Sequence, residues 1–235
     1  GLSDLALRYD LTVPTARVVA NYKNELPKFF KRYQIQPVWR ADRPARGRFR
    51  EFYQCDVDAI GSKSMIVEAE LISAVCEILE RLGFEDFVVR LNDREVLTAI
   101  LNDSKIDTML HSDALVAIDK LDKIGVDGVK KEFAERGIAA ESGEALLQWL
   151  ASETPAADAS LSVSNENILG KFSAKTGEIA LADRVKTILG SLSESVQNKV
   201  SVDFSLARGL SYYTGAIFEI VLTNGDFKGS IGGGG

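Results

Sequence analysis

Five arginines occur within eleven residues in the first quarter of the chain, and arginine is the side chain best suited to binding phosphate. They are Arg40, Arg43, Arg46, Arg48 and Arg50. A guanidinium group donates two parallel hydrogen bonds to one phosphate, which a lysine ammonium cannot do. The cluster therefore predicts a site for a phosphate-bearing ligand, although an exposed basic hairpin would carry the same residues.

Two strands are expected to position these arginines. Pro44 and Gly47 favour a loop inside the cluster, and residues 36–40 and 49–60 on either side have the pattern of β-strands. Side chains alternate between the two faces of a strand. One face of the second strand is therefore predicted to carry Arg48, Arg50, Phe52, Gln54, Asp56 and Asp58. The other face is more apolar, and we expect it to point inward and to bury Cys55.

The segments around this hairpin are expected to be a strand and two helices. Residues 5–11 have the pattern of a strand, and Thr12 is a good N-cap for a following helix, with Pro14 just inside it. Residues 26–33 are predicted to form a short amphipathic helix. A scaffold helix is predicted over residues 64–82.

The second half of the chain is predicted to be mainly helical. Residues 87–91 form an apolar strand, and helical patterns then dominate from residue 92 to about residue 199. The expected helices cover residues 94–101, 114–123, 129–136, 144–150 and 179–192, and the Ser- and Ala-rich residues 152–167 are expected to form a loop. Strands return at residues 200–204 and 216–222.

The composition is that of an ordinary globular chain. Of 235 residues, 46% are hydrophobic and 26% are charged, which is enough for a sizeable core. The net charge of −6 argues against a protein that coats nucleic acid, although a local arginine cluster can still bind one phosphate ligand. Cys55, Cys76 and the single His111 supply neither a disulfide framework nor a metal ligand set, so we expect no bound metal and a reducing cytoplasm.

Three segments together resemble the histidyl-tRNA synthetases, a family of class II aminoacyl-tRNA synthetases. They are LALRYDLTVPTAR at residues 5–17, WRADRPARGRFREFYQCDVDAIG at residues 39–61 and LARGLSYYTG at residues 206–215. The second is similar to motif 2, in which a loop that embraces ATP joins two antiparallel strands. The resemblance implies an α+β fold, with a mixed, mainly antiparallel sheet flanked by helices. It also implies a partial catalytic domain at residues 1–91 and 200–235, with a helical insertion domain at residues 92–199.

The resemblance also implies roles for individual residues. ATP would bind to Arg40, Arg48, Arg50 and Phe52, with Arg40 on the α-phosphate and Phe52 stacked on adenine. Histidine would bind to Asp10, Thr12, Gln54, Asp58, Arg208, Tyr212 and Tyr213. Arg208 and Arg40 would be catalytic, because two fixed cations can hold the histidine carboxylate against an anionic phosphate. The family has an acidic residue where this chain has Ser211, so the contact owed to that carboxylate is in doubt.

The implied activity is that of a histidine–tRNA ligase. ATP, together with Mg²⁺, would activate histidine to histidyl-adenylate, and the histidyl group would then pass to tRNA(His). The implied partners are histidine, ATP, tRNA(His) and a second subunit in a homodimeric parent enzyme, without a membrane.

The resemblance is incomplete and leaves alternatives open. Motif 1, motif 3 and the anticodon-binding domain have no counterpart, so the chain is expected to be a fragment of the catalytic domain with its insertion. A catalytically inactive synthetase-like regulatory protein, such as a subunit of ATP phosphoribosyltransferase or a domain of a stress kinase, would share the fold. The intact LARGLSYYTG segment favours the ligase. A generic nucleotide-binding domain is disfavoured because the chain contains neither a Walker A nor a G-x-G-x-x-G sequence.

Overall fold

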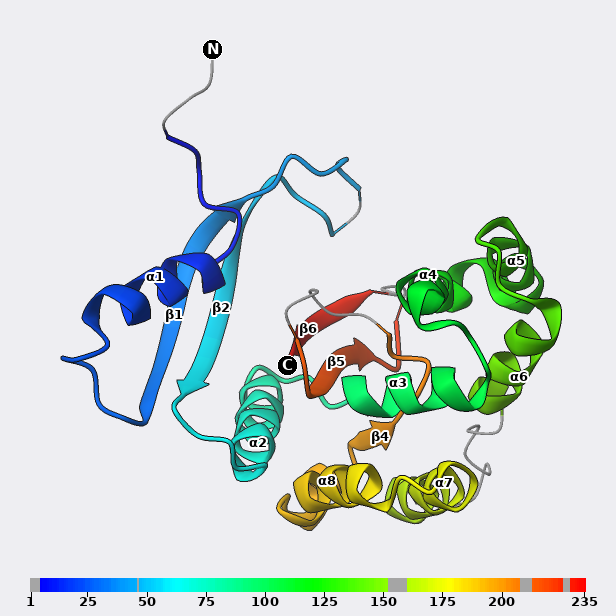
Figure 1. Cartoon of the computed structure of the whole chain (residues 1–235). Helices are drawn as coiled ribbons and strands as arrows, with labels where there is room; N and C mark the ends of the chain where they lie inside the picture. Colours follow the sequence, from blue (N-terminus) through cyan, green and yellow to red (C-terminus); the bar gives the residue numbers. More distant parts are fainter. Residues whose placement is uncertain (1–4, 46, 152–159, 208–212, 226–228) are drawn as a thin grey trace. The chain divides into compact units, whose positions relative to one another are not determined.

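The computed structural model describes residues 5–45, 47–151, 160–207, 213–225 and 229–235 (Figure 1). The chain divides into two compact units, residues 1–67 and residues 68–235. Helices and mainly antiparallel strands occur together, which confirms the predicted α+β class. The predicted insertion domain at residues 92–199 stays a prediction. None of the described helices combines the length and the apolarity that crossing a bilayer requires.

The first unit is built on a long antiparallel hairpin. Strand β1 (Phe30–Trp39) pairs with β2 (Glu51–Ile60) from the Phe30–Ile60 pair to the Trp39–Glu51 pair. The predicted hairpin is confirmed, but the helix expected at residues 26–33 is wrong. Residues from Phe30 onward belong to β1 instead, because the strand ladder satisfies their backbone groups along the whole length of β2.

Helix α1 (Thr12–Tyr22) precedes the hairpin and starts differently from the prediction. Its N-cap position is Leu11, so Thr12 is the first helical residue and not the cap. Asp10 supplies the capping bond, since its Oδ1 accepts from the Val13 N–H at 3.2 Å. The strand predicted at residues 5–11 is also wrong: the Trp39 N–H of β1 donates to the Arg8 carbonyl at 2.9 Å, but this segment forms no strand.

The face of the hairpin that was expected to be buried is exposed, and the polar face is the one that is partly buried. The face predicted to be inward is open to solvent, with Tyr33 78% exposed, Tyr53 72% exposed and Cys55 also exposed. The polar face is half-buried, because Arg32 and Arg40 of the hairpin donate to carbonyls of residues 9–11 and Arg8 donates back to the hairpin at Pro37. The prediction that Cys55 is a core residue is therefore wrong, whereas Cys76 is buried as expected.

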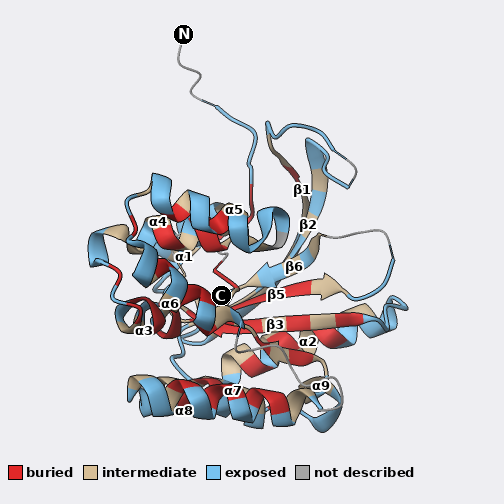
Figure 2. Cartoon of the chain, turned by 90° about the vertical axis from the view of Figure 1, so that its right-hand side faces the viewer, coloured by how far each residue is buried: buried red, intermediate tan, exposed pale blue. Residues whose placement is uncertain are grey.

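The second unit contains a four-stranded sheet with β3 (Phe87–Asp93) inside it. The strand order is β4 (Val200–Val202), β3, β5 (Ala216–Leu222) and β6 (Ser230–Gly234). β3 pairs parallel with β4 and antiparallel with β5, and β5 pairs antiparallel with β6. Burial is concentrated on β3, on β5 and on the inner sides of the helices around them (Figure 2). The predicted strands at residues 87–91 and 216–222 are thus confirmed, and the one predicted at residues 200–204 is confirmed for Val200–Val202 only.

Helices make up most of the rest of this unit. They are α2 (Ile66–Arg81), α3 (Arg94–Asp103), the 3-10 helix η1 (Thr108–Leu110), α4 (His111–Ile118), α5 (Leu121–Glu135), α6 (Ala140–Ala151), α7 (Leu161–Thr176), α8 (Ile179–Gly190) and α9 (Glu194–Gln197). The single helix predicted at residues 114–123 is wrong, since α4 ends at Ile118 and α5 begins at Leu121. α5 itself is kinked at Gly125, whose φ of 67° is not helical.

Helix α7 replaces residues 161–167 of the predicted loop at residues 152–167. The Ser160 hydroxyl accepts from the Val163 N–H and caps the helix. Asn165 then reaches the edge strand β4: its amide nitrogen donates to the Val200 carbonyl and its amide oxygen accepts from the Val202 N–H, both at 2.8 Å. One buried side chain thus supplies the bonds that a neighbouring strand would give. Residues 152–159 lie outside the described residues.

The glycines of β6 leave room for the large side chains of β5. A Cβ atom on Gly234 would lie 2.5 Å from Cζ of Phe218, and one on Gly232 would lie 2.9 Å from Cδ1 of Ile220. Phe218 and Ile220 are both buried. The glycine run at the end of the chain is therefore a packing requirement of this sheet.

We expect alanine to have opposite effects at two glycines of this unit. Gly234→Ala should lower the free energy of unfolding by about 1–3 kcal/mol, because the new methyl group overlaps the Phe218 ring. Gly170→Ala should raise it by about 0.5–1 kcal/mol, because Gly170 lies inside α7 with nothing within 4 Å of the added Cβ. Denaturant unfolding of both variants checks this. A destabilised Gly170→Ala variant, or an unaffected Gly234→Ala variant, contradicts it.

Candidate functional site

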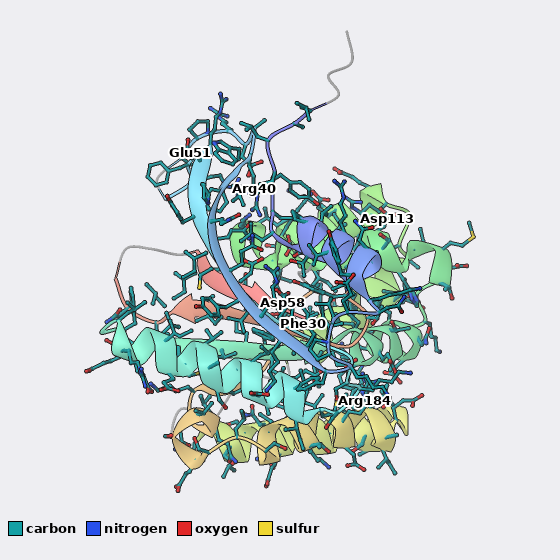
Figure 3. All side chains as sticks on the ribbon, turned by 90° about the vertical axis from the view of Figure 1, so that its left-hand side faces the viewer. Phe30, Arg40, Glu51, Asp58, Asp113 and Arg184 are labelled. Carbon is teal, nitrogen blue, oxygen red and sulfur yellow. The ribbon has the colours of Figure 1, made fainter. Side chains whose placement is uncertain are left out.

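One face of the β1–β2 hairpin gathers polar side chains in opposed pairs. Across the ladder, Arg32 faces Asp58, Gln34 faces Asp56 and Gln36 faces Gln54. All six side chains are half-buried, in contrast to the exposed residues between them. Figure 3 shows Asp58 toward one end of the hairpin and Arg40 at the other end, near the loop. The face predicted from β2 is therefore present for Phe52, Gln54, Asp56 and Asp58.

Arg32 is the residue of this face that sequence reasoning missed. Its side chain is only 12% exposed, and its Nη2 lies 2.7 Å from Oδ2 of Asp58. The same nitrogen donates to the Leu11 carbonyl at 3.2 Å, and Nη1 contacts the Gln34 amide oxygen. Arg32 thus joins both strands to the turn before α1. The signal was available in the period-two pattern of residues 30–36, but the prediction of a helix there hid it.

Two more arginines attach residues 5–11 to the hairpin. Arg8 donates from Nη1 to Oε1 of Gln36 at 2.7 Å and from Nε to the Pro37 carbonyl at 3.2 Å. Arg40 donates from Nε to the Tyr9 carbonyl at 3.1 Å. These long-range bonds place Asp10, which follows directly in the chain, against the polar face. Thr12 lies half-buried at the first residue of α1.

Four buried polar atoms on this side of the hairpin have no hydrogen-bond partner among the described residues. Nε of Arg32 and Oδ2 of Asp58 belong to two residues that form an ion pair with each other. The other two are Oδ2 of Asp10, whose residue is 4% exposed, and Oε1 of Gln54. A buried polar atom without a partner costs free energy, so native proteins seldom leave one without a reason. The atoms of Asp10 and Gln54 are both acceptors, and a cationic donor such as an ammonium group would satisfy them.

The carboxylates of the face influence one another. Burial raises the pKa of Asp56 above its ordinary value, and the neighbouring carboxylates of Asp58 and Asp10 raise it further. The guanidinium groups of Arg32 and Arg40 act in the opposite direction on the same pKa. The face therefore holds several acidic groups whose repulsion is only partly balanced by the two arginines.

The arginines of the cluster divide into two kinds. Arg40 is half-buried, with its Cζ 5.1 Å from the centroid of the Phe52 ring, and its N–H donates to the Arg50 carbonyl at 2.9 Å. Arg48 and Arg50 lie before β2 with exposed side chains, so the structure does not bring them onto the polar face. The prediction that β2 begins at residue 49 and carries both of them is corrected accordingly.

The predicted residues of the LARGLSYYTG segment belong to the second unit. Arg208 and Tyr212 lie outside the described residues, as does Ser211. Tyr213 is half-buried, and a Cβ atom on Gly235 would lie 2.8 Å from its Cγ, so the ring packs against the end of the glycine run.

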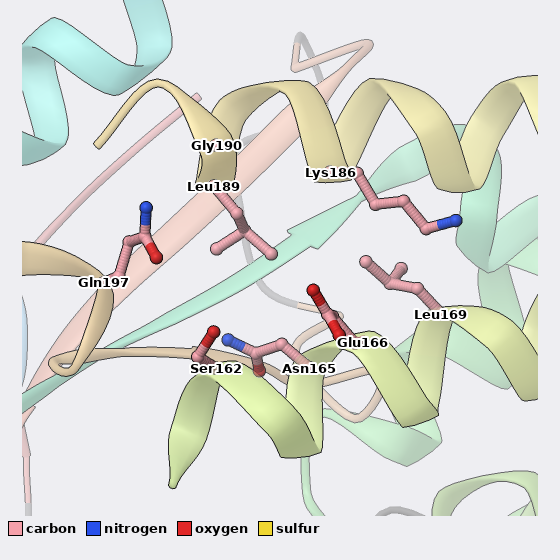
Figure 4. Close-up of a pocket in the computed structure, with 8 residues that line it drawn as sticks. All are labelled: Ser162, Asn165, Glu166, Leu169, Lys186, Leu189, Gly190 and Gln197. Carbon is pink, nitrogen blue, oxygen red and sulfur yellow. The ribbon is translucent and has the colours of Figure 1, made fainter. Parts of the chain in front are cut away.

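A pocket of about 350 Å³ in the second unit does not coincide with any predicted site residue. It lies between α7 and α8 (Figure 4), and its lining consists of Ser162, Asn165, Glu166, Leu169, Lys186, Leu189, Gly190 and Gln197. Its two charged side chains have opposite signs, and it holds no arginine. We therefore assign the candidate site to the hairpin face. Within the described parts of the chain, no group of three or more His, Cys, Asp or Glu residues could hold a metal ion.

Removing Arg32 should raise the pKa of Asp56 further. In Arg32→Gln the cation is lost while the carboxylates of Asp58 and Asp10 remain, so the protonated form of Asp56 is favoured. A carboxyl whose folded-state pKa is raised contributes stability below its unfolded pKa, and this is lost as the pH rises through the folded pKa. Arg32→Gln should therefore steepen the loss of stability with rising pH above about 4, near the ordinary pKa of a carboxyl.

Carboxyl-carbon NMR titration measures this pKa directly. Lys31→Gln is the matched control, because Lys31 is the next residue of β1 and its side chain is on the opposite, exposed face. An Asp56 pKa that is unchanged in Arg32→Gln, or that moves equally in Lys31→Gln, would show that Arg32 does not act on this carboxylate.

The chain is similar in sequence to curated histidine–tRNA ligases. It is 44% identical to "Histidine--tRNA ligase" of Flavobacterium johnsoniae over all of this chain and 48% of that protein. The chain thus spans about half the length of the curated relatives it matches.

Solved structures agree with this similarity. The histidyl-tRNA synthetase from Nostoc sp. PCC 7120 matches 94% of this chain, and 52% of its own, with a TM-score of 0.78 and 30% identity. An "ATP phosphoribosyltransferase regulatory subunit/histidyl-tRNA synthetase" from Bacillus halodurans C matches 92% of this chain, and 54% of its own, with a TM-score of 0.71. That match is 22% identical, so it shows a shared fold only. A family model described as "Histidyl-tRNA synthetase" matches residues 2–235, and the chain belongs to that family.

Proposed function

We propose that the protein carrying this chain is a histidine–tRNA ligase, which activates histidine with ATP and transfers the histidyl group to tRNA(His). The observation that carries the proposal beyond family membership is the pair of buried, unpartnered acceptors of Asp10 and Gln54 on the hairpin face. An amino acid substrate brings the ammonium group that these atoms lack.

In this proposal the polar face binds the histidine ammonium. Oδ1 of Asp10 is already used by the Val13 N–H, which fixes the carboxylate and leaves Oδ2 for the substrate. Gln54 offers its amide oxygen, and Thr12 offers a hydroxyl beside the same turn. Asp58, which Arg32 keeps in place, completes the anionic side of the site. An ammonium bound among these groups gains charge-assisted hydrogen bonds.

The loop end of the hairpin is proposed to bind the nucleotide. Arg40 and the Phe52 ring are neighbours, so one nucleotide can meet both, with Arg40 on the α-phosphate and Phe52 stacked on adenine. Arg48 and Arg50 are exposed on the loop side and can reach the outer phosphates. Mg²⁺ would arrive with ATP as part of the substrate, and no step is assigned to it here.

The chemical step is an in-line displacement. A histidine carboxylate oxygen forms a bond to the α-phosphorus, the bond to pyrophosphate breaks, and histidyl-adenylate results. Two anionic groups must be held together, so fixed cations and correct alignment supply most of the catalysis. Arg40 and Arg208 are proposed for this role, and Tyr212 and Tyr213 are proposed to line the imidazole pocket. The proposal includes a homodimeric enzyme in the cytoplasm.

A regulatory protein without ligase activity is the less supported alternative. Identity to proteins named histidine–tRNA ligase is 41–44% for the sequence relatives, against 22% for the structure whose name includes a regulatory subunit. Histidine-dependent exchange between ATP and pyrophosphate separates the two functions. We expect exchange in the protein that carries this chain, and its absence there would refute the ligase.

Arg40→Gln should lower the exchange rate by about 10²-fold, because one cation at the reacting phosphate is lost. Arg81→Gln is the matched control: Arg81 is 78% exposed on α2 and pairs only with Glu77 among the described residues, so its rate should stay within about twofold. Equal rates in the two variants would remove Arg40 from the site.

Arg208→Ala should lower the rate of adenylate formation by at least ~10²-fold while histidine affinity changes much less, which is the pattern of a transition-state stabiliser. Arg208→Lys should restore little, because an ammonium cannot form the two-pronged contact of a guanidinium. Single-turnover kinetics with histidine titration measure both quantities. A wild-type rate in Arg208→Ala would exclude the role and favour the regulatory alternative.

A further inference from the structure

The junction between β3 and α3 buries polar groups that the proposed site does not use. Asn92 and Asp93 are each 1% exposed, although they end a strand of the central sheet. Polar side chains this deeply buried are retained only where their hydrogen bonds are made. The partners of this junction therefore indicate what it holds in place.

Asn92 and Arg94 hold both described ends of the LARGLSYYTG segment. The Asn92 amide donates to the Leu206 carbonyl at 3.1 Å, and the Arg94 guanidinium donates to the Ala207 carbonyl at 3.3 Å. The Arg94 backbone N–H donates to the Gly215 carbonyl at 2.9 Å. The tripeptide of residues 92–94 thus binds both described ends of this segment, which lie more than a hundred residues away in the sequence.

Asp93 links this junction to helix α8. Its Oδ1 accepts from the Glu95 N–H at 2.8 Å and caps α3, while its Oδ2 lies 2.9 Å from Nη2 of Arg184. The other terminal nitrogen of Arg184 lies 2.8 Å from Oε1 of Glu95. Arg184, labelled in Figure 3, therefore holds two carboxylates at the start of α3.

The guanidinium of Arg184 also lies directly against Gly215. A Cβ atom on Gly215 would be 3.2 Å from its Nη2, which is tight contact with the same nitrogen that binds Asp93. The next residue, Ala216, is the ladder partner of Asp93. One ion pair thus braces the point where the LARGLSYYTG segment enters β5.

We propose that Asp93 and Arg184 are positioning residues for histidine activation, because their ion pair fixes the backbone at Gly215. The inference rests on the proposed function, which assigns the segment around Arg208 to histidine and the reacting phosphate. Neither residue is proposed to touch substrate. Both act through the described ends of the segment, Leu206 and Ala207 on one side and Gly215 on the other.

The exchange rate of the Arg94 backbone amide tests whether the ion pair fixes Gly215, because this N–H donates to the Gly215 carbonyl. The measurement does not require enzymatic activity. Arg184→Gln should speed its exchange by about tenfold or more, since it leaves the buried Asp93 carboxylate without its cation. Asp93→Asn should speed it in the same direction, since Arg184 loses the charge that holds it beside Gly215 and keeps only Glu95. Asp93→Asn keeps the side-chain oxygen that caps α3, so it separates loss of the ion pair from loss of the cap. Lys186→Gln, on the same helix with an exposed pair to Asp183, should leave the rate within about twofold. Unchanged protection in both test variants overturns the brace.

Histidine-dependent pyrophosphate exchange tests the consequence for catalysis. Arg184→Gln should lower kcat at least about tenfold with little change in the KM for ATP, and Arg184→Lys, which keeps a cation beside Asp93, should recover a large part of it. A normal kcat in Arg184→Gln, in a wild-type background that is active, overturns the inference and leaves the proposed function intact. A wild-type protein without exchange overturns the proposed function, and the positioning role in activation falls with it.

Discussion

The arrangement of the first unit depends on one guanidinium held between two strands and a turn. Arg32 is almost enclosed, and a charge in that position must be matched by an opposite charge and by acceptors. Asp58 and the Leu11 carbonyl meet this requirement. Because those partners lie in β2 and before α1, satisfying one side chain brings together three segments that are separate in the sequence. Helix α1 buries only Thr15 among its own residues, and the apolar residues Leu11 and Val38 are fully buried in this unit, so polar bonds act together with a small core to hold residues 5–11 on the hairpin.

The same constraint explains which parts of the site could be predicted. The period-two pattern of β2 correctly placed Phe52, Gln54, Asp56 and Asp58 on one face, since alternation follows from strand geometry alone. It could not show which face is covered. Hydrophobicity predicted that the face of Tyr53 and Cys55 is buried, but the structure partly buries the polar face. It does so through arginines whose bonding partners are 21 to 31 residues distant in sequence. Local patterns carry no information about such bonds.

The prediction of helices and loops failed where one side chain makes a backbone hydrogen bond that the local sequence pattern does not reveal. Residues 161–167 of α7 were expected to belong to a loop because residues 152–167 are rich in Ser, Ala and Asn, yet Asn165 is buried there and bonds to the edge strand β4. Thr12 was expected to cap α1, but the carboxylate two residues earlier has the better geometry. Long segments with strong periodicity, such as α2 and β3, were predicted well because packing and propensity agree there.

Both units therefore hold the stretch that is proposed to bind substrate by the same kind of hydrogen bond. In each, side chains donate to backbone carbonyls across a long sequence separation: the half-buried Arg32 to Leu11 and Arg40 to Tyr9 in the first unit, and the buried Asn92 to Leu206 in the second. Such bonds fix a segment that has no regular hydrogen bonding of its own, as neither residues 5–11 nor residues 203–207 form a strand. The bond from Asn92 tolerates little change, because removing that donor leaves a buried carbonyl unsatisfied. Irregular backbone held in this way can present groups to a ligand in orientations that helices and strands do not allow. Its precision then depends on the few side chains that hold it.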